Sequence, residues 1–156
     1  MDNSKNLNVI ALDAMGGDYG PEVTVPAAVE ATKKKDLTVI LVGEKELIDR
    51  ELSKFSSLET SLLSVVPAQG VVTEEESPAL AYRTKPRASV YVAAGVVKAG
   101  KASGFVSMGS TGASIAASTV LYGTMDGIER GAIGGPVIGY SPRTVIVDLG
   151  TNVDTR

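Results

Sequence analysis

The chain has 156 residues, of which 44% are hydrophobic and 21% charged, and its net charge is −3. This length suits one domain with its own core, and the acidic balance argues against a nucleic-acid surface, where basic patches dominate. The sequence contains neither histidine nor cysteine, which excludes Ser-His-Asp triads, disulfides and metal sites built on histidine or thiolate ligands within these residues.

Apolar runs alternate with helical patterns in the first part of the chain. Residues 7–12, 37–42 and 61–66 are short apolar runs typical of buried strands. Between them, residues 23–35 and 44–55 carry apolar side chains at helical spacing. This β-α-β-α-β order predicts a single α/β domain, with an open, mostly parallel sheet, right-handed crossovers and helices on both faces.

A turn with two adjacent glycines follows the first predicted strand. Its residues are Asp13-Ala14-Met15-Gly16-Gly17-Asp18, and a helix starts just after them at Gly20-Pro21. In open α/β sheets, ligands bind beyond the carboxyl ends of the strands. Glycine lets a ligand approach the main chain, and a helix start offers unpaired N–H groups to an anion. On the local pattern alone, an ordinary turn that needs glycine for its backbone angles is the more frequent case.

The middle of the chain is predicted to be helical. Residues 68–77 form an acidic loop, and Ser77-Pro78 indicates the start of a short helix that carries Arg83 and Lys85. A second helix is predicted from residue 89 to residue 97. It is apolar on nearly every side, as a deeply packed helix is.

Two further turns repeat the pattern of the first. A short strand at residues 105–108 leads into Gly109-Ser110-Thr111-Gly112-Ala113 and a helix over 114–122. A strand is indicated over 132–138 in the glycine-rich stretch that follows, and a buried strand over 144–147 ends in Asp148-Leu149-Gly150-Thr151-Asn152. We expect the three turns to meet at one edge of the sheet and to form an anion-handling site there; three purely structural turns are the alternative.

The three turn motifs, at residues 13–18, 107–113 and 148–152, resemble the N-terminal motifs of the bacterial phosphate acyltransferase family of phospholipid synthesis. Further residues fit the family's pattern in the same order: Ser77-Pro78, Ala81, Arg83, Lys85 and Ser89. The resemblance covers essentially the whole chain and matches only the N-terminal half of the family's longer members. The chain departs from the pattern at Ser110, where asparagine is usual, and at Thr151, where alanine is usual.

The resemblance implies an activity, a fold and partners. Members of the family transfer a fatty acyl group from acyl carrier protein, or from acyl-CoA, to inorganic phosphate and so form acyl phosphate. They need no metal or organic cofactor, are typically homodimers, and have a fold similar to that of isocitrate and isopropylmalate dehydrogenases. They act in the cytoplasm and at the inner membrane surface. The sequence agrees with a cytoplasmic location, since no signal-peptide pattern or run of ~20 apolar residues occurs.

Two groups of site residues follow from turn position and motif match. Those expected to take part in catalysis are Lys85, Ser107, Thr111 and Asn152. Those expected to bind substrate are Asp13, Gly16, Gly17, Asp18, Arg83, Gly109, Ser110, Gly112 and Asp148. Main-chain N–H groups in the glycine turns are predicted to hold phosphate or the thioester oxyanion. The Arg83 or Lys85 side chain would neutralise phosphate, whereas the aspartates orient the loops.

Two other classes of function stay open. A nicotinamide-dependent dehydrogenase also uses strand–glycine–helix turns, but the first strand is not followed by the G-x-G-x-x-G pattern. Alternatively, the chain is a non-catalytic fragment that serves binding or dimerisation.

Overall fold

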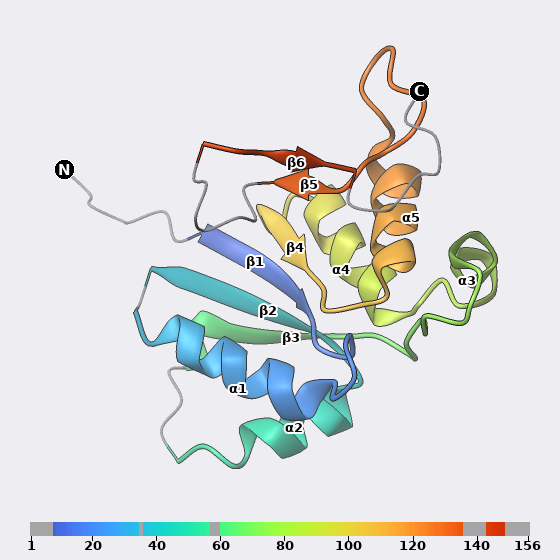
Figure 1. The fold of residues 1–156 in the computed structure, drawn as a ribbon. Helices are drawn as coiled ribbons and strands as arrows, with labels where there is room; N and C mark the ends of the chain where they lie inside the picture. Colours follow the sequence, from blue (N-terminus) through green and yellow to red (C-terminus); the bar gives the residue numbers. More distant parts are fainter. Residues whose placement is uncertain (1–7, 35, 57–59, 136–142, 149–156) are drawn as a thin grey trace.

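A computed structural model describes residues 8–34, 36–56, 60–135 and 143–148 (Figure 1). The elements run in the order β1 (Asn8–Asp13), α1 (Pro21–Thr32), β2 (Leu37–Gly43), α2 (Lys45–Leu52), the 3-10 turn η1 (Thr60–Leu62), β3 (Leu63–Pro67), α3 (Pro78–Thr84), α4 (Ser89–Lys98), β4 (Gly104–Val106), α5 (Thr111–Tyr122), β5 (Gly134–Gly135) and β6 (Ile146–Val147). The predicted α/β class is confirmed.

The main sheet has four parallel strands in the order β3-β2-β1-β4. The chain runs outward from β1 through β2 to β3, and then returns to the other side of β1 as β4 (Figure 1). Strand order therefore reverses between β1 and β4. In open α/β sheets this switch point is where ligands bind, beyond the carboxyl ends of the strands.

Helices cover both faces of this sheet, as the alternating pattern predicts (Figure 1). On one face, Val25 of α1 and Ile48 of α2 pack with Leu41 of β2. On the other face, α4 places Ala93 and Val96 against β1 and β2. Full burial of a side chain the size of valine, leucine or isoleucine stabilises the fold by about 1.5–3 kcal/mol. Helices α3 and α5 pack with α4 in one cluster, and Phe105 of β4 packs against this cluster, which includes Ala113 near the start of α5.

The last predicted strand exists, but its predicted burial is wrong. Residues 146–147 do form a strand, β6, but it pairs antiparallel with β5 in a separate two-stranded sheet. Val145 and Val147 are 62% and 68% exposed, whereas the apolar run predicts burial. A run of apolar residues indicates that a strand needs cover on both faces, but the other parts of the described chain leave these side chains uncovered. The strand predicted over 132–138 is seen only as β5, and residues 136–138 lie outside the described ranges.

None of the helices that the structure describes is long and apolar enough to cross a membrane.

Candidate functional site at the β1–β4 switch point

The β1–α1 turn and the β4–α5 turn meet beyond the carboxyl ends of their strands. A Cβ atom at Gly16 would lie 2.9 Å from both Asp13 Oδ2 and the Gly109 carbonyl oxygen, closer than real Cβ contacts. At Gly17 the backbone has φ +80°, and a Cβ would lie 3.0 Å from Met108 Cβ. Glycine is therefore needed here both for the backbone angles and for the close approach of the two turns. Convergence of the first two predicted turns is confirmed.

Asp13 connects the two turns. Its side chain is fully buried at the end of β1. The Met15 N–H donates to Asp13 Oδ1 at 3.1 Å, and the Ser107 hydroxyl lies 2.8 Å from Asp13 Oδ2. The predicted role of this aspartate in orienting a loop agrees with these contacts.

Burial raises the pKa of Asp13 above its ordinary value. The hydroxyls of Ser89 and Ser107 and the N–H groups of Met15 and Gly16 lower the pKa by smaller amounts, so the net direction is upward. The Ser89 hydroxyl is the largest of these lowering causes, although within the described chain Ser89 Oγ makes no hydrogen bond of normal geometry. Among the described residues, no charged side chain contributes to the shift.

At the start of α5, two main-chain donors already have partners. The Ala113 N–H donates to Oγ of Ser110, the buried N-cap residue, at 3.2 Å. The Thr111 N–H donates to Glu74 Oε1 at 3.2 Å. A carboxylate thus occupies the end of α5 where the helix dipole favours an anion. Gly112 packs against α3, and a Cβ there would lie 2.7 Å from Pro78 Cγ.

These segments enclose a cleft of about 300 Å³, lined by residues from 15–18, 71–75 and 108–110. Its ionisable lining residues are Asp18, Glu74 and Glu75, and no lysine or arginine in the described ranges lines it. The cleft therefore offers main-chain donors surrounded by carboxylates. Nor do the described residues bring together three or more acidic side chains in a group that could hold a metal ion.

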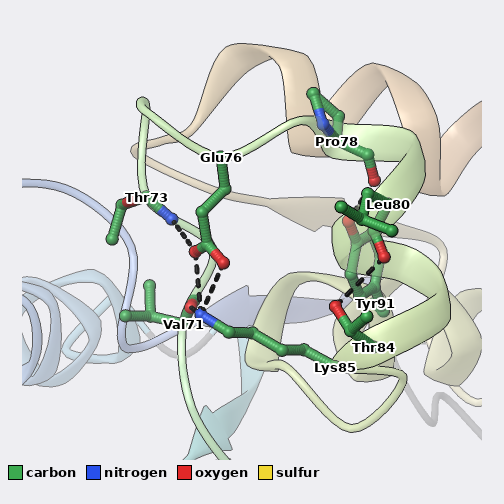
Figure 2. Close-up of polar contacts among 8 residues, drawn as sticks. All are labelled: Val71, Thr73, Glu76, Pro78, Leu80, Thr84, Lys85 and Tyr91. Carbon is green, nitrogen blue, oxygen red and sulfur yellow. Dashed lines mark hydrogen bonds and ion pairs between the residues drawn. The ribbon is translucent and has the colours of Figure 1, made fainter.

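Lys85 does not itself line this cleft; its side chain contacts the loop between β3 and α3 (Figure 2). Its Nζ lies 2.8 Å from the Glu76 carboxylate and donates to the Val71 carbonyl at 3.2 Å. The hydrogen bond from Lys85 is the largest cause that lowers the pKa of Glu76, and the Thr73 N–H, at 3.0 Å, is the next. Lys85 thereby holds the loop between β3 and α3 in place. Its predicted action on phosphate remains a prediction, as does that of Arg83, an exposed residue of α3 outside the cleft lining.

The structure brings most of the predicted site residues of the first two turns together, and Asp148 of the third turn does not line the cleft. Asp148 follows β6, outside the four-stranded sheet, and has φ 61°. Asn152 lies outside the described residues. Sequence reasoning missed Glu74 and Glu75 as cleft residues. Their signal was present, because the loop that carries them follows β3, whose carboxyl end lies at the same edge of the parallel sheet.

The comparisons with known proteins point to one family. The family model described as "Fatty acid synthesis protein" matches residues 8–156, nearly the whole chain. The chain belongs to this fatty acid synthesis protein family. Its curated relatives include the phosphate acyltransferases of Clostridium kluyveri, 39% identical over 148 residues, and of Syntrophomonas wolfei, 43% identical over 153 residues.

The match covers most of this chain but less than half of each relative. For the Clostridium kluyveri protein the shares are 95% of this chain and 44% of the relative, and for the Syntrophomonas wolfei protein they are 94% and 46%. A phosphate acyltransferase of Legionella pneumophila is 40% identical, with shares of 97% and 44%. The predicted family is therefore confirmed, and the chain spans somewhat less than half the length of these members.

Proposed function

We propose that this chain supplies the anion-handling part of a phosphate acyltransferase, which moves a fatty acyl group from acyl carrier protein, or from acyl-CoA, to inorganic phosphate. One observation carries the proposal: Gly16 and Gly17 bring the β1–α1 turn against the β4–α5 turn at the switch point of the sheet. The names of the relatives support the same activity.

The reaction suits a site without histidine or cysteine. A phosphate oxygen attacks the thioester carbonyl carbon and gives a tetrahedral oxyanion, and the C–S bond then breaks to release the thiolate and acyl phosphate. Hydrogen phosphate is already an oxyanion at neutral pH, so it needs no activated side-chain nucleophile. The leaving thiol has a pKa near ~8.5, so a general acid helps less than it would for an alkoxide.

The site must then supply position and charge complementarity. Main-chain N–H groups at Gly17 and the first turn of α5 hold phosphate or the oxyanion in this proposal, and each well-placed donor contributes about 3–4 kcal/mol to transition-state stabilisation. Ser107 and Thr111 add hydroxyl groups at the same rim. By the family resemblance, we further propose a homodimer without metal or organic cofactor, a dehydrogenase-like complete fold, and action in the cytoplasm and at the inner membrane surface.

The test is an assay of acyl phosphate formation from acyl-acyl carrier protein and phosphate. It uses this chain alone and then with a separately produced polypeptide that corresponds to the remaining length of the Clostridium kluyveri relative. We expect turnover in the second case. Association of the two polypeptides without turnover would instead indicate a non-catalytic binding fragment, and a rise in melting temperature with NAD would indicate the dehydrogenase class.

A further inference from the structure

The Ser107 hydroxyl faces more acceptors than it can serve when Asp13 is ionised. Ser107 Oγ lies 2.8 Å from Asp13 Oδ2 and 2.9 Å from the Gly109 carbonyl oxygen, and it accepts from the Gly109 N–H at 3.3 Å. A hydroxyl has one hydrogen to donate and two lone pairs to accept. With an ionised Asp13, one of the two short oxygen–oxygen contacts has no hydrogen of its own.

A proton on Asp13 satisfies every contact of the Ser107 hydroxyl. The Asp13 carboxylic acid donates to Ser107 Oγ, the Ser107 hydroxyl donates to the Gly109 carbonyl, and the second lone pair of Ser107 accepts from the Gly109 N–H. Asp13 Oδ1 still accepts from the Met15 N–H.

We propose that Asp13 is a positioning residue that joins the β1–α1 and β4–α5 turns as a neutral carboxylic acid, through a chain of hydrogen bonds from Asp13 to Ser107 to the Gly109 carbonyl. The environment fits: the side chain is fully buried, and the groups of the described chain that act on it are hydroxyls and main-chain N–H groups, without a charged side chain. The functional part rests on the proposed function, since a neutral Asp13 places no negative charge beneath the turn that receives phosphate.

The direct test is a carbon-13 NMR titration of the Asp13 carboxyl in the 156-residue chain. We expect its midpoint above the ordinary value for aspartate. A carboxyl that is already ionised at the pH of the phosphate measurement would overturn the proposal. The readout needs neither phosphate nor turnover, so it decides this inference even if the proposed function fails.

Two substitutions test whether Asp13 acts as a neutral acid or as an ionised carboxylate. Asp13→Asn keeps the shape and a donor toward Ser107 but cannot ionise, whereas Asp13→Ala removes both oxygens. We expect Asp13→Asn to bind inorganic phosphate within about twofold of wild type, and Asp13→Ala to lose roughly tenfold in affinity, by calorimetry. Equal losses in the two variants would contradict the proposal. If wild type binds no phosphate, the proposed function fails and the titration alone decides.

The pH dependence of stability gives a further readout with a definite sign. Because the pKa of Asp13 is raised in the folded protein, its contribution to stability is complete below the unfolded value and is lost as pH rises through the folded value. Asp13→Asn should therefore remove a fall in stability with rising pH that wild type shows. Parallel stability–pH curves for the two proteins would count against a raised pKa.

Discussion

Gly16 is the residue at which the two turns leave least room for a side chain. Its added Cβ would lie within 2.9–3.0 Å of Asp13 Oδ2, the Gly109 carbonyl oxygen and Ser107 Oγ. Two of these three groups belong to the opposite turn, so a side chain must push the turns apart. We expect Gly16→Ala to lower the free energy of unfolding by about 1–3 kcal/mol, the range for overpacking. Urea titration of the purified variant measures it.

Gly95 provides the matched control for that substitution. It lies inside α4, and an added Cβ there would meet no atom within 4 Å. Because alanine is the better helix former, Gly95→Ala should raise the free energy of unfolding by up to ~1 kcal/mol. If Gly16→Ala were as stable as Gly95→Ala, the result would contradict the close approach of the β1–α1 and β4–α5 turns.

At this scale the sequence could indicate single residues but not their partners. The glycine pairs of the first two motifs were found because such turns have a recognisable composition. The contact between Asp13 and Ser107 joins residues 94 positions apart, and nothing in local spacing says which hydroxyl meets which carboxyl. Nor does spacing show that Asp13 is fully buried, which is the cause of its raised pKa.

The loop between β3 and α3 controls the charge of the cleft. Glu74 accepts from the Thr111 N–H at the start of α5, where the proposed function places an anion. Phosphate must displace this carboxylate or bind beside it. Under the proposed function, we expect Glu74→Ala to raise phosphate affinity roughly fivefold, because it frees a helix N-terminal donor and removes a like charge. Calorimetric titration with inorganic phosphate measures the change.

Glu75 provides the control that tests whether phosphate affinity depends on the contact of Glu74 with α5 or only on the negative charge of the cleft. It lines the same cleft, but its carboxylate interacts with Thr73 and its own main chain instead of with α5. Glu75→Ala removes the same charge and leaves the Thr111 N–H bonded. We expect Glu75→Ala to raise phosphate affinity less than Glu74→Ala does. Equal gains would mean that the contact with α5 has no part in phosphate binding.

Whole elements were the most predictable level of this structure. Periodicity located β1, β2, α1 and α4 because each carries its own apolar pattern. It failed for β6, whose apolar residues predict burial, whereas Val147 is 68% exposed. A strand's pattern shows that it needs cover, but the segment that covers it belongs to another part of the fold.

For the whole molecule, the alternating pattern predicts a parallel sheet but not its strand order. The return of the chain to the free side of β1 is what places the β4–α5 turn beside Gly16 and Gly17. Had β4 joined the sheet beside β3, the same motifs would lie at opposite sides of the sheet. The candidate site therefore depends on tertiary packing, in which α4 covers the face shared by β1 and β2.

Stability should be unevenly distributed over the two sheets. In the main sheet, β2 pairs on both sides, and Leu41 and Val42 are fully buried. The β5–β6 sheet has two residues in each strand, and Val147 is 68% exposed. Hydrogen exchange of the native chain, corrected for intrinsic rates, should show amides of β2 protected on the order of a hundredfold or more over those of β6, because local opening costs least where few buried contacts are lost. Comparable protection of Leu41 and Ile146 would show that β6 is covered in solution and shares the cooperative core.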